Sequence, residues 1–131
     1  MQKQEIGHKA EQLALFYLQQ QGLELKHQNF HSRYGEIDLI MLHQNTLCFI
    51  EVRARRQSNY GSAVDSVNLR KQHKIIQTAQ VYLQNYPMYE NLVARFDVIA
   101  FDYLHPSIWQ KNFQQQLAQI AIDWIQDAYI L

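Results

Sequence analysis

The sequence predicts a mixed α/β fold, in which an antiparallel three-strand meander forms part of a central mixed β-sheet flanked by helices. Residues 35–40 and 49–53 alternate acidic and apolar side chains with a period of two, which is the pattern of a half-buried strand. Gln44-Asn45 is the polar break between the two apolar runs and predicts a hairpin. Helical periodicity before and after this hairpin gives the order helix, three strands, helix, strand, an αβββαβ core.

Length and composition limit the class of protein. A chain of 131 residues is expected to form one domain, residues 1–131. The 12 basic and 12 acidic residues cancel, which argues against bulk, non-specific nucleic-acid binding. The single Cys48 excludes an intrachain disulfide, and its parity places it on the strand face opposite Glu51, so we expect it in the core. Because no long apolar run is present, we expect a cytoplasmic protein with no membrane segment.

The first half of the chain has clear periodicity. Residues 5–21 predict an amphipathic helix that ends at Gly22, with Glu11 at the border of its apolar stripe. Residues 23–31 predict a strand, residues 32–35 a turn, and residues 46–54 the third strand of the meander.

The second half is expected to begin with a loop over residues 55–67 and to continue with a helix over residues 68–86, ended by Pro87. Gln72 falls on the apolar stripe of this helix and is therefore expected to turn toward the acidic strands, whereas Lys71 and Lys74 diverge toward solvent. The stripe consists of Leu69, Ile76, Ala79 and Leu83.

The C-terminal third is less regular. Residues 94–103 predict a strand that joins the sheet in parallel by a crossover, which makes the sheet mixed. Residues 109–119 are compatible with strand or helix, and residues 122–129 predict a short amphipathic helix.

Carboxylates in the middle of strands are the feature of the sequence that points to chemistry. Asp38 and Glu51 lie on adjacent predicted strands, and Arg53 follows Glu51 on the same face. A structural ion pair between Asp38 and Arg53 is the plainer explanation, because opposite charges across a hairpin are common. The alternative is a site for a hard divalent cation such as Mg²⁺ or Mn²⁺, which prefers oxygen ligands and retains several waters.

Basic residues cluster after the third strand and suggest contacts to a phosphate backbone. Arg55 and Arg56 open the predicted loop, and Lys71 and Lys74 lie in the helix that follows. The expected nucleic-acid contacts are Arg33, Arg55, Arg56, Lys71, Gln72 and Lys74. A solvated charged surface is an equally plain explanation. The absence of a glycine-rich phosphate loop and of zinc-ligand spacing argues against P-loop hydrolysis and zinc binding.

Several short motifs together resemble a known family. The motifs are Gly7-x-x-x-Glu11, residues 35–40, residues 49–55, Lys71-Gln72-His73-Lys74, residues 95–98 and residues 124–129. They extend over nearly the whole chain and resemble the YraN family of uncharacterised bacterial proteins. That family resembles archaeal Holliday junction resolvases and the wider restriction-endonuclease-like fold of the PD-(D/E)xK nucleases.

The resemblance implies roles for particular residues. Asp38 matches the motif aspartate, Glu51 the second carboxylate, and Glu11 the glutamate of the first helix. Arg53 stands where the motif usually has lysine, and a guanidinium cannot act as a general base. Arg53 could instead orient a water or clamp the scissile phosphate. Related resolvases are dimers, so the resemblance also implies a homodimer.

The preferred functional hypothesis is a Mg²⁺- or Mn²⁺-dependent endonuclease that cuts phosphodiester bonds of DNA, including branched or repair intermediates. Asp38, Glu51 and the Val52 carbonyl would bind the ion, and Glu11 would act through water. A nucleic-acid-binding protein that no longer cleaves is the alternative, motivated by the neutral charge and by Arg53. An interaction module with a structural ion-pair network is a third possibility, and RNA remains open as a partner.

Overall fold

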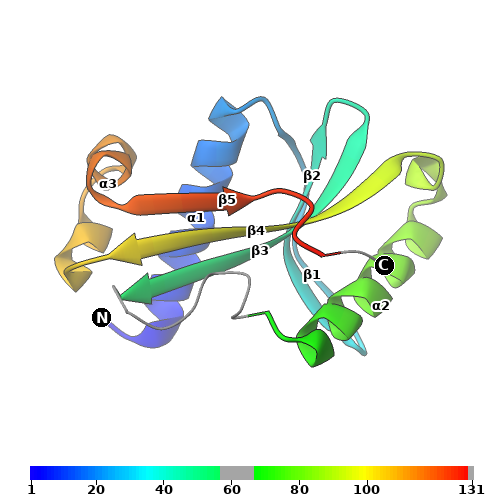
Figure 1. Cartoon of the computed structure of the whole chain (residues 1–131), viewed down its shortest axis with the longest axis horizontal. Coiled ribbons are helices and arrows are strands. Elements are labelled where there is room, and N and C mark those ends of the chain that lie inside the picture. Colours follow the sequence, from blue (N-terminus) through cyan, green and yellow to red (C-terminus); the bar gives the residue numbers. More distant parts are fainter. Residues whose placement is uncertain (57–66, 130–131) are drawn as a thin grey trace.

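A computed structural model describes residues 1–56 and 67–129, which form a five-stranded sheet in the order β1-β2-β3-β4-β5 with helices on both faces (Figure 1). The strands are β1 (Glu24–Ser32), β2 (Gly35–His43), β3 (Thr46–Arg56), β4 (Val93–Tyr103) and β5 (Ala121–Ile125). The α-helices are α1 (Lys3–Gln20), α2 (Leu69–Asn85) and α3 (Phe113–Gln119), and the short 3₁₀ helices are η2 (Pro87–Tyr89) and η3 (Pro106–Gln110). Within the described ranges, no helix combines the length and the apolar character needed to cross a membrane.

The meander and the crossover agree with the sequence. β1, β2 and β3 pair antiparallel, and Gln44 adopts a left-handed φ of 56° in the hairpin turn between β2 and β3. β3 and β4 pair in parallel through α2, so the predicted mixed sheet is confirmed. Arg55 and Arg56 belong to β3 and not to the loop predicted over residues 55–67, because both pair with β4. Residues 57–66 of that predicted loop lie outside the described residues.

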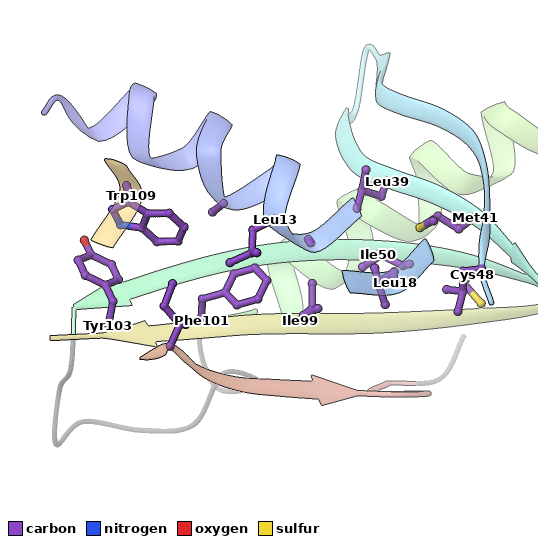
Figure 2. Close-up of a cluster of buried hydrophobic side chains, with 14 of the residues drawn as sticks. Leu13, Leu18, Leu39, Met41, Cys48, Ile50, Ile99, Phe101, Tyr103 and Trp109 are labelled. Carbon is purple, nitrogen blue, oxygen red and sulfur yellow. The ribbon is translucent and has the colours of Figure 1, made fainter. Parts of the chain in front are cut away.

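One face of the sheet is covered by α1, η3 and α3. Leu13 and Leu18 of α1 point into the layer that Ile50, Ile99 and Phe101 form on the strands (Figure 2). The amphipathic helix predicted over residues 5–21 is confirmed, since α1 buries one stripe that consists of Ala10, Leu13, Ala14 and Leu18. Cys48 is fully buried in the same layer, as its parity predicted.

The opposite face is covered by α2, whose buried stripe differs from the prediction. Leu69 is 71% exposed, and the buried residues are Ile75, Thr78, Ala79 and Tyr82. Two of these carry hydroxyl groups, which can be buried once they are hydrogen-bonded. The Thr78 hydroxyl lies 2.9 Å from Ser32 Oγ and donates to the Lys74 carbonyl at 2.8 Å, and the Tyr82 hydroxyl lies 3.3 Å from His27 Nδ1. The apolar pattern thus placed Ala79 correctly and found Ile76 and Leu83 at the partly buried border of the stripe, but it was wrong for Leu69 and missed the two buried hydroxyl residues.

The C-terminal segment contains a strand where a helix was predicted over residues 122–129. β5 pairs antiparallel with β4 from Ala121 to Ile125, and α3 precedes it with a capping box from Asn112 and Gln115. The buried Asp97 of β4 accepts hydrogen bonds from Trp124 Nε1 at 3.0 Å and from the Asp127 amide at 2.9 Å. This pairing with an edge of the sheet is non-local, so the helical periodicity of the segment did not reveal it.

Candidate metal and phosphodiester site

The candidate site lies where β2 and β3 separate. Their pairing ends at Leu39 opposite Ile50, and the next residues toward the open end are Asp38 and Glu51. In place of a ladder bond, Asp38 Oδ2 accepts a hydrogen bond from the Val52 amide at 2.8 Å. The side chain of Asp38 thus bridges the two diverging strands.

Both carboxylates face one pocket of about 400 Å³ and are nearly buried, Asp38 at 9% and Glu51 at 7% exposure. The separation of the strands gives this pocket access to α1 on one side and to α2 on the other. The residues that line it are Gln4, Gly7, His8, Ala10, Glu11, Asn29, Glu36, Asp38, Glu51, Val52, Arg53, Ala54 and Lys71.

The electrostatics of the pocket are dominated by crowded, buried carboxyl groups. Burial, followed by the charge of Glu11, raises the pKa of Asp38 to about 7, although the Val52 amide opposes the shift. Burial, followed by the charge of Asp38, raises the pKa of Glu51 to about 7. Burial also raises the pKa of Glu11, which hydrogen-bonds to Asp38 and Asn29. A cation that enters the pocket would relieve this repulsion.

Two cationic side chains approach the same oxygen of Glu51. Lys71 Nζ lies 3.1 Å from Glu51 Oε1, and Arg53 Nη2 lies 4.0 Å from it. The prediction that Lys71 diverges toward solvent is therefore wrong. The apolar stripe predicts that Lys71 points away from the sheet, but the packing of α2 brings its ammonium to Glu51 on β3.

The other predicted nucleic-acid contacts do not gather around the pocket. Gln72 does not line it, because its amide donates to the Val67 carbonyl at 2.8 Å. Arg33 lies in the β1–β2 turn with its guanidinium 4.8 Å from the centre of the Tyr34 ring. Lys74 is exposed on α2, outside the pocket.

The two arginines at the end of β3 make contacts near its partner strand. Arg55 pairs with Asp102 of β4 at 3.1 Å, and Arg56 donates to the Leu104 carbonyl at 3.4 Å. Neither lines the carboxylate pocket.

The oxygen donors in the pocket suit a hard divalent cation that takes its other ligands from the backbone, from water and from phosphate. Among the residues that the structure describes, no group of three His, Cys, Asp or Glu side chains could hold a metal ion. Asp38 and Glu51 could provide two carboxylates, and Val52, which also lines the pocket, could provide a backbone carbonyl. All of these donors are oxygens, which suits Mg²⁺ or Mn²⁺ with the remaining ligands supplied by water and phosphate.

Sequence reasoning missed Asn29 and the inward position of Lys71. Asn29 adopts a left-handed φ of 50° within β1, a conformation that asparagine tolerates, and it lines the pocket beside Glu11. No local pattern marks either residue, because both depend on how β1 and α2 pack around the gap between β2 and β3.

The chain is thus a mixed α/β protein with a carboxylate pocket where two strands of its sheet separate. Residues 10–101 match the model of the uncharacterised protein family UPF0102, and the chain belongs to this family, also called YraN.

Relatives with the same family name match three quarters or more of the chain. A UPF0102 protein of Acinetobacter baumannii strain AYE is 47% identical over 130 residues, which cover 98% of this chain and 96% of the relative. A UPF0102 protein of Acinetobacter baylyi is 43% identical over 128 residues, with 96% and 90% coverage. A UPF0102 protein of Pseudomonas syringae pv. syringae is 47% identical over 100 residues, with 76% and 81% coverage.

Proposed function

We propose that this chain is a metal-dependent endonuclease of the restriction-endonuclease-like class that hydrolyses phosphodiester bonds of DNA, with branched repair or recombination intermediates as the substrate class. The observation that carries the proposal is the convergence of the nearly buried Asp38 and Glu51 on one pocket. Burial of carboxylates without full neutralisation costs roughly several kcal/mol, so a purely structural role gives no reason for it. A site that binds a cation and a phosphate gives a reason for these buried carboxylates.

Asp38, Glu51 and the Val52 carbonyl would hold Mg²⁺ or Mn²⁺. When bound, such an ion lowers the pKa of a coordinated water and offsets the charge of the phosphate. In the hydrolysis, a water oxygen would bond to phosphorus as the bond from phosphorus to one sugar oxygen breaks. The water would release one proton to solvent, the departing sugar oxygen would take one up from solvent, and the other product would retain the phosphate.

The chain's own residues orient the reacting groups. Glu11 of α1 lines the same pocket as Asp38 and would contribute to the ion through a water molecule. Arg53 stays protonated and cannot accept a proton from water. Its guanidinium, beside Glu51 in the pocket, is suited to donate hydrogen bonds to phosphate oxygens as negative charge develops.

The topology supports the fold assignment. The helix, the three-strand meander, the second helix and the parallel β4 follow one another in the order that the restriction-endonuclease-like fold implies. Within this order the two carboxylates lie on β2 and β3, and Glu11 lies on α1.

The test is a cleavage assay on labelled four-way, flapped and linear DNA with Mg²⁺ or Mn²⁺, in parallel with a binding assay on the same substrates and on RNA. We expect cleavage by the wild type, loss of cleavage in Asp38→Asn, and full activity in Asp123→Asn, a variant of an exposed aspartate on β5. Binding with no cut product under any metal would favour the non-cleaving nucleic-acid-binding protein. If the protein neither binds nor cleaves any of these substrates, both functions are contradicted.

A further inference from the structure

Lys71 occupies an unusual position for a surface-helix lysine. The side chain of Asn68 accepts a hydrogen bond from the Lys71 amide at 2.9 Å, which fixes the first turn of α2. From this turn the Lys71 side chain reaches across to β3, where its ammonium lies 3.1 Å from Glu51 Oε1. The side chain is 36% exposed, so it contacts both the pocket and solvent.

The two cations at Glu51 differ in their distance from the carboxylate and in their exposure to solvent. Arg53 belongs to β3, its side chain is 27% exposed, and it lies 4.0 Å from Glu51 Oε1. Lys71 is closer to this oxygen and carries its charge on a flexible four-carbon chain. A divalent cation at Asp38 and Glu51 would compete with the Lys71 ammonium for the same carboxylate.

Resting on the function proposed above, we propose that Lys71 is the exchangeable cation of this site. Without metal it neutralises Glu51. Once Asp38 and Glu51 hold a divalent ion, its ammonium moves from Glu51 Oε1 to an oxygen of the scissile phosphate. Lys71 of α2 thereby supplies an ammonium group to the phosphate. The family motif usually has a lysine on the strand, at the position that Arg53 occupies here. Lys71 forms no covalent bond and donates only hydrogen bonds and positive charge.

If Lys71 has this role, removing its charge should strengthen metal binding and slow catalysis. In Lys71→Met, Glu51 loses its competing cation, so Mn²⁺ measured by calorimetry on the full chain should bind about three- to tenfold more tightly. The single-turnover cleavage rate at saturating DNA should fall about 100-fold, the typical loss when one charge-stabilising donor is removed. A merely structural ion pair would not produce this combination.

Two further variants serve as controls. Lys74→Met removes a lysine from the same helix outside the pocket and should change neither the Mn²⁺ affinity nor the rate by more than about twofold. Lys71→Arg keeps the charge, so its Mn²⁺ affinity should remain close to that of the wild type. Thermal melting checks that each variant is folded.

The Mn²⁺ binding measurement tests the proposal even if the protein does not cleave DNA. Equal or weaker Mn²⁺ binding by folded Lys71→Met would overturn it, as would a cleavage rate within threefold of an active wild type. If the wild type binds Mn²⁺ but cuts no DNA, the proposed nuclease function fails, and tighter Mn²⁺ binding by Lys71→Met would still support the exchange at Glu51.

Discussion

At the scale of single residues, Asp38 and Glu51 destabilise the metal-free fold at neutral pH. The pKa of Asp38 is raised from 3.8 to about 7 in the folded chain, mainly by burial. Between these two pH values the unfolded chain releases a proton that the folded chain retains. The free energy of unfolding therefore falls as pH rises through this window, and the penalty is complete above pH 7. Glu51 contributes in the same direction.

Asp38→Asn should consequently stabilise the metal-free protein at neutral pH. The amide oxygen can still accept the bond from the Val52 amide, while the buried charge is removed. We expect a gain of about 1–2 kcal/mol at pH 8, seen as a rise of several degrees in the thermal midpoint. The gain should shrink toward zero near pH 4.

Melting curves in a metal chelator between pH 4 and 8 measure this effect, with Asp123→Asn as the exposed control. A variant less stable than the wild type at pH 8, or a difference that does not depend on pH, would show that Asp38 is a structural residue.

At the scale of elements, α2 provides a direct comparison between the predicted and the observed buried stripe. Ile75 is 3% exposed and packs against the sheet, whereas Leu69 is 71% exposed. Ile75→Ala should lower the free energy of unfolding by about 2–4 kcal/mol, and Leu69→Ala by less than about 0.5 kcal/mol. Urea unfolding of the two variants measures the difference. Similar losses in both would mean that the helix packs as the apolar pattern alone suggests.

The junction of β4 and β5 depends on Asp97, which is fully buried. Besides Trp124 and the Asp127 amide, it pairs with Arg95 Nε at 2.9 Å. Removing one charge of a buried pair leaves the other uncompensated, so Asp97→Asn should cost about 3 kcal/mol.

The partly exposed pair of Arg55 with Asp102 provides the matched control, because Asp102 lies on the same strand as Asp97. Asp102 has a side chain that is 38% exposed, and Asp102→Asn should cost less than about 1 kcal/mol. Urea unfolding followed by tryptophan fluorescence compares the two variants. Equal costs would argue that Asp97 does not hold β5 in place.

Much of the framework could be predicted from local patterns, and the failures share one cause. Period-two alternation fixed the parity of Asp38 and Glu51, and the hairpin brought them to one pocket. The inward position of Lys71, the left-handed Asn29 and the pairing of β5 with β4 depend on contacts between distant segments. Such contacts leave no periodic signal, because hydroxyl groups, salt bridges and edge pairing are satisfied only in the folded state.

At the scale of the whole molecule, acidic and basic residues are balanced in number. The formal net charge is zero, and Arg55, Arg95 and Lys26 each pair with an acidic residue. The electrostatic field of the whole molecule therefore attracts a polyanion only weakly. The proposed interaction with a phosphodiester would therefore depend on the local site that α1, β2, β3 and α2 assemble around Asp38 and Glu51.

That local site is most directly tested by anomalous diffraction from crystals soaked in Mn²⁺. We predict one anomalous peak in the pocket, within about 2.5 Å of carboxylate oxygens of both Asp38 and Glu51, that is lost in crystals of Asp38→Asn. A soaked wild-type crystal with no peak between these two side chains, or an unchanged peak in Asp38→Asn, would contradict the assignment of this pocket as a divalent-cation site.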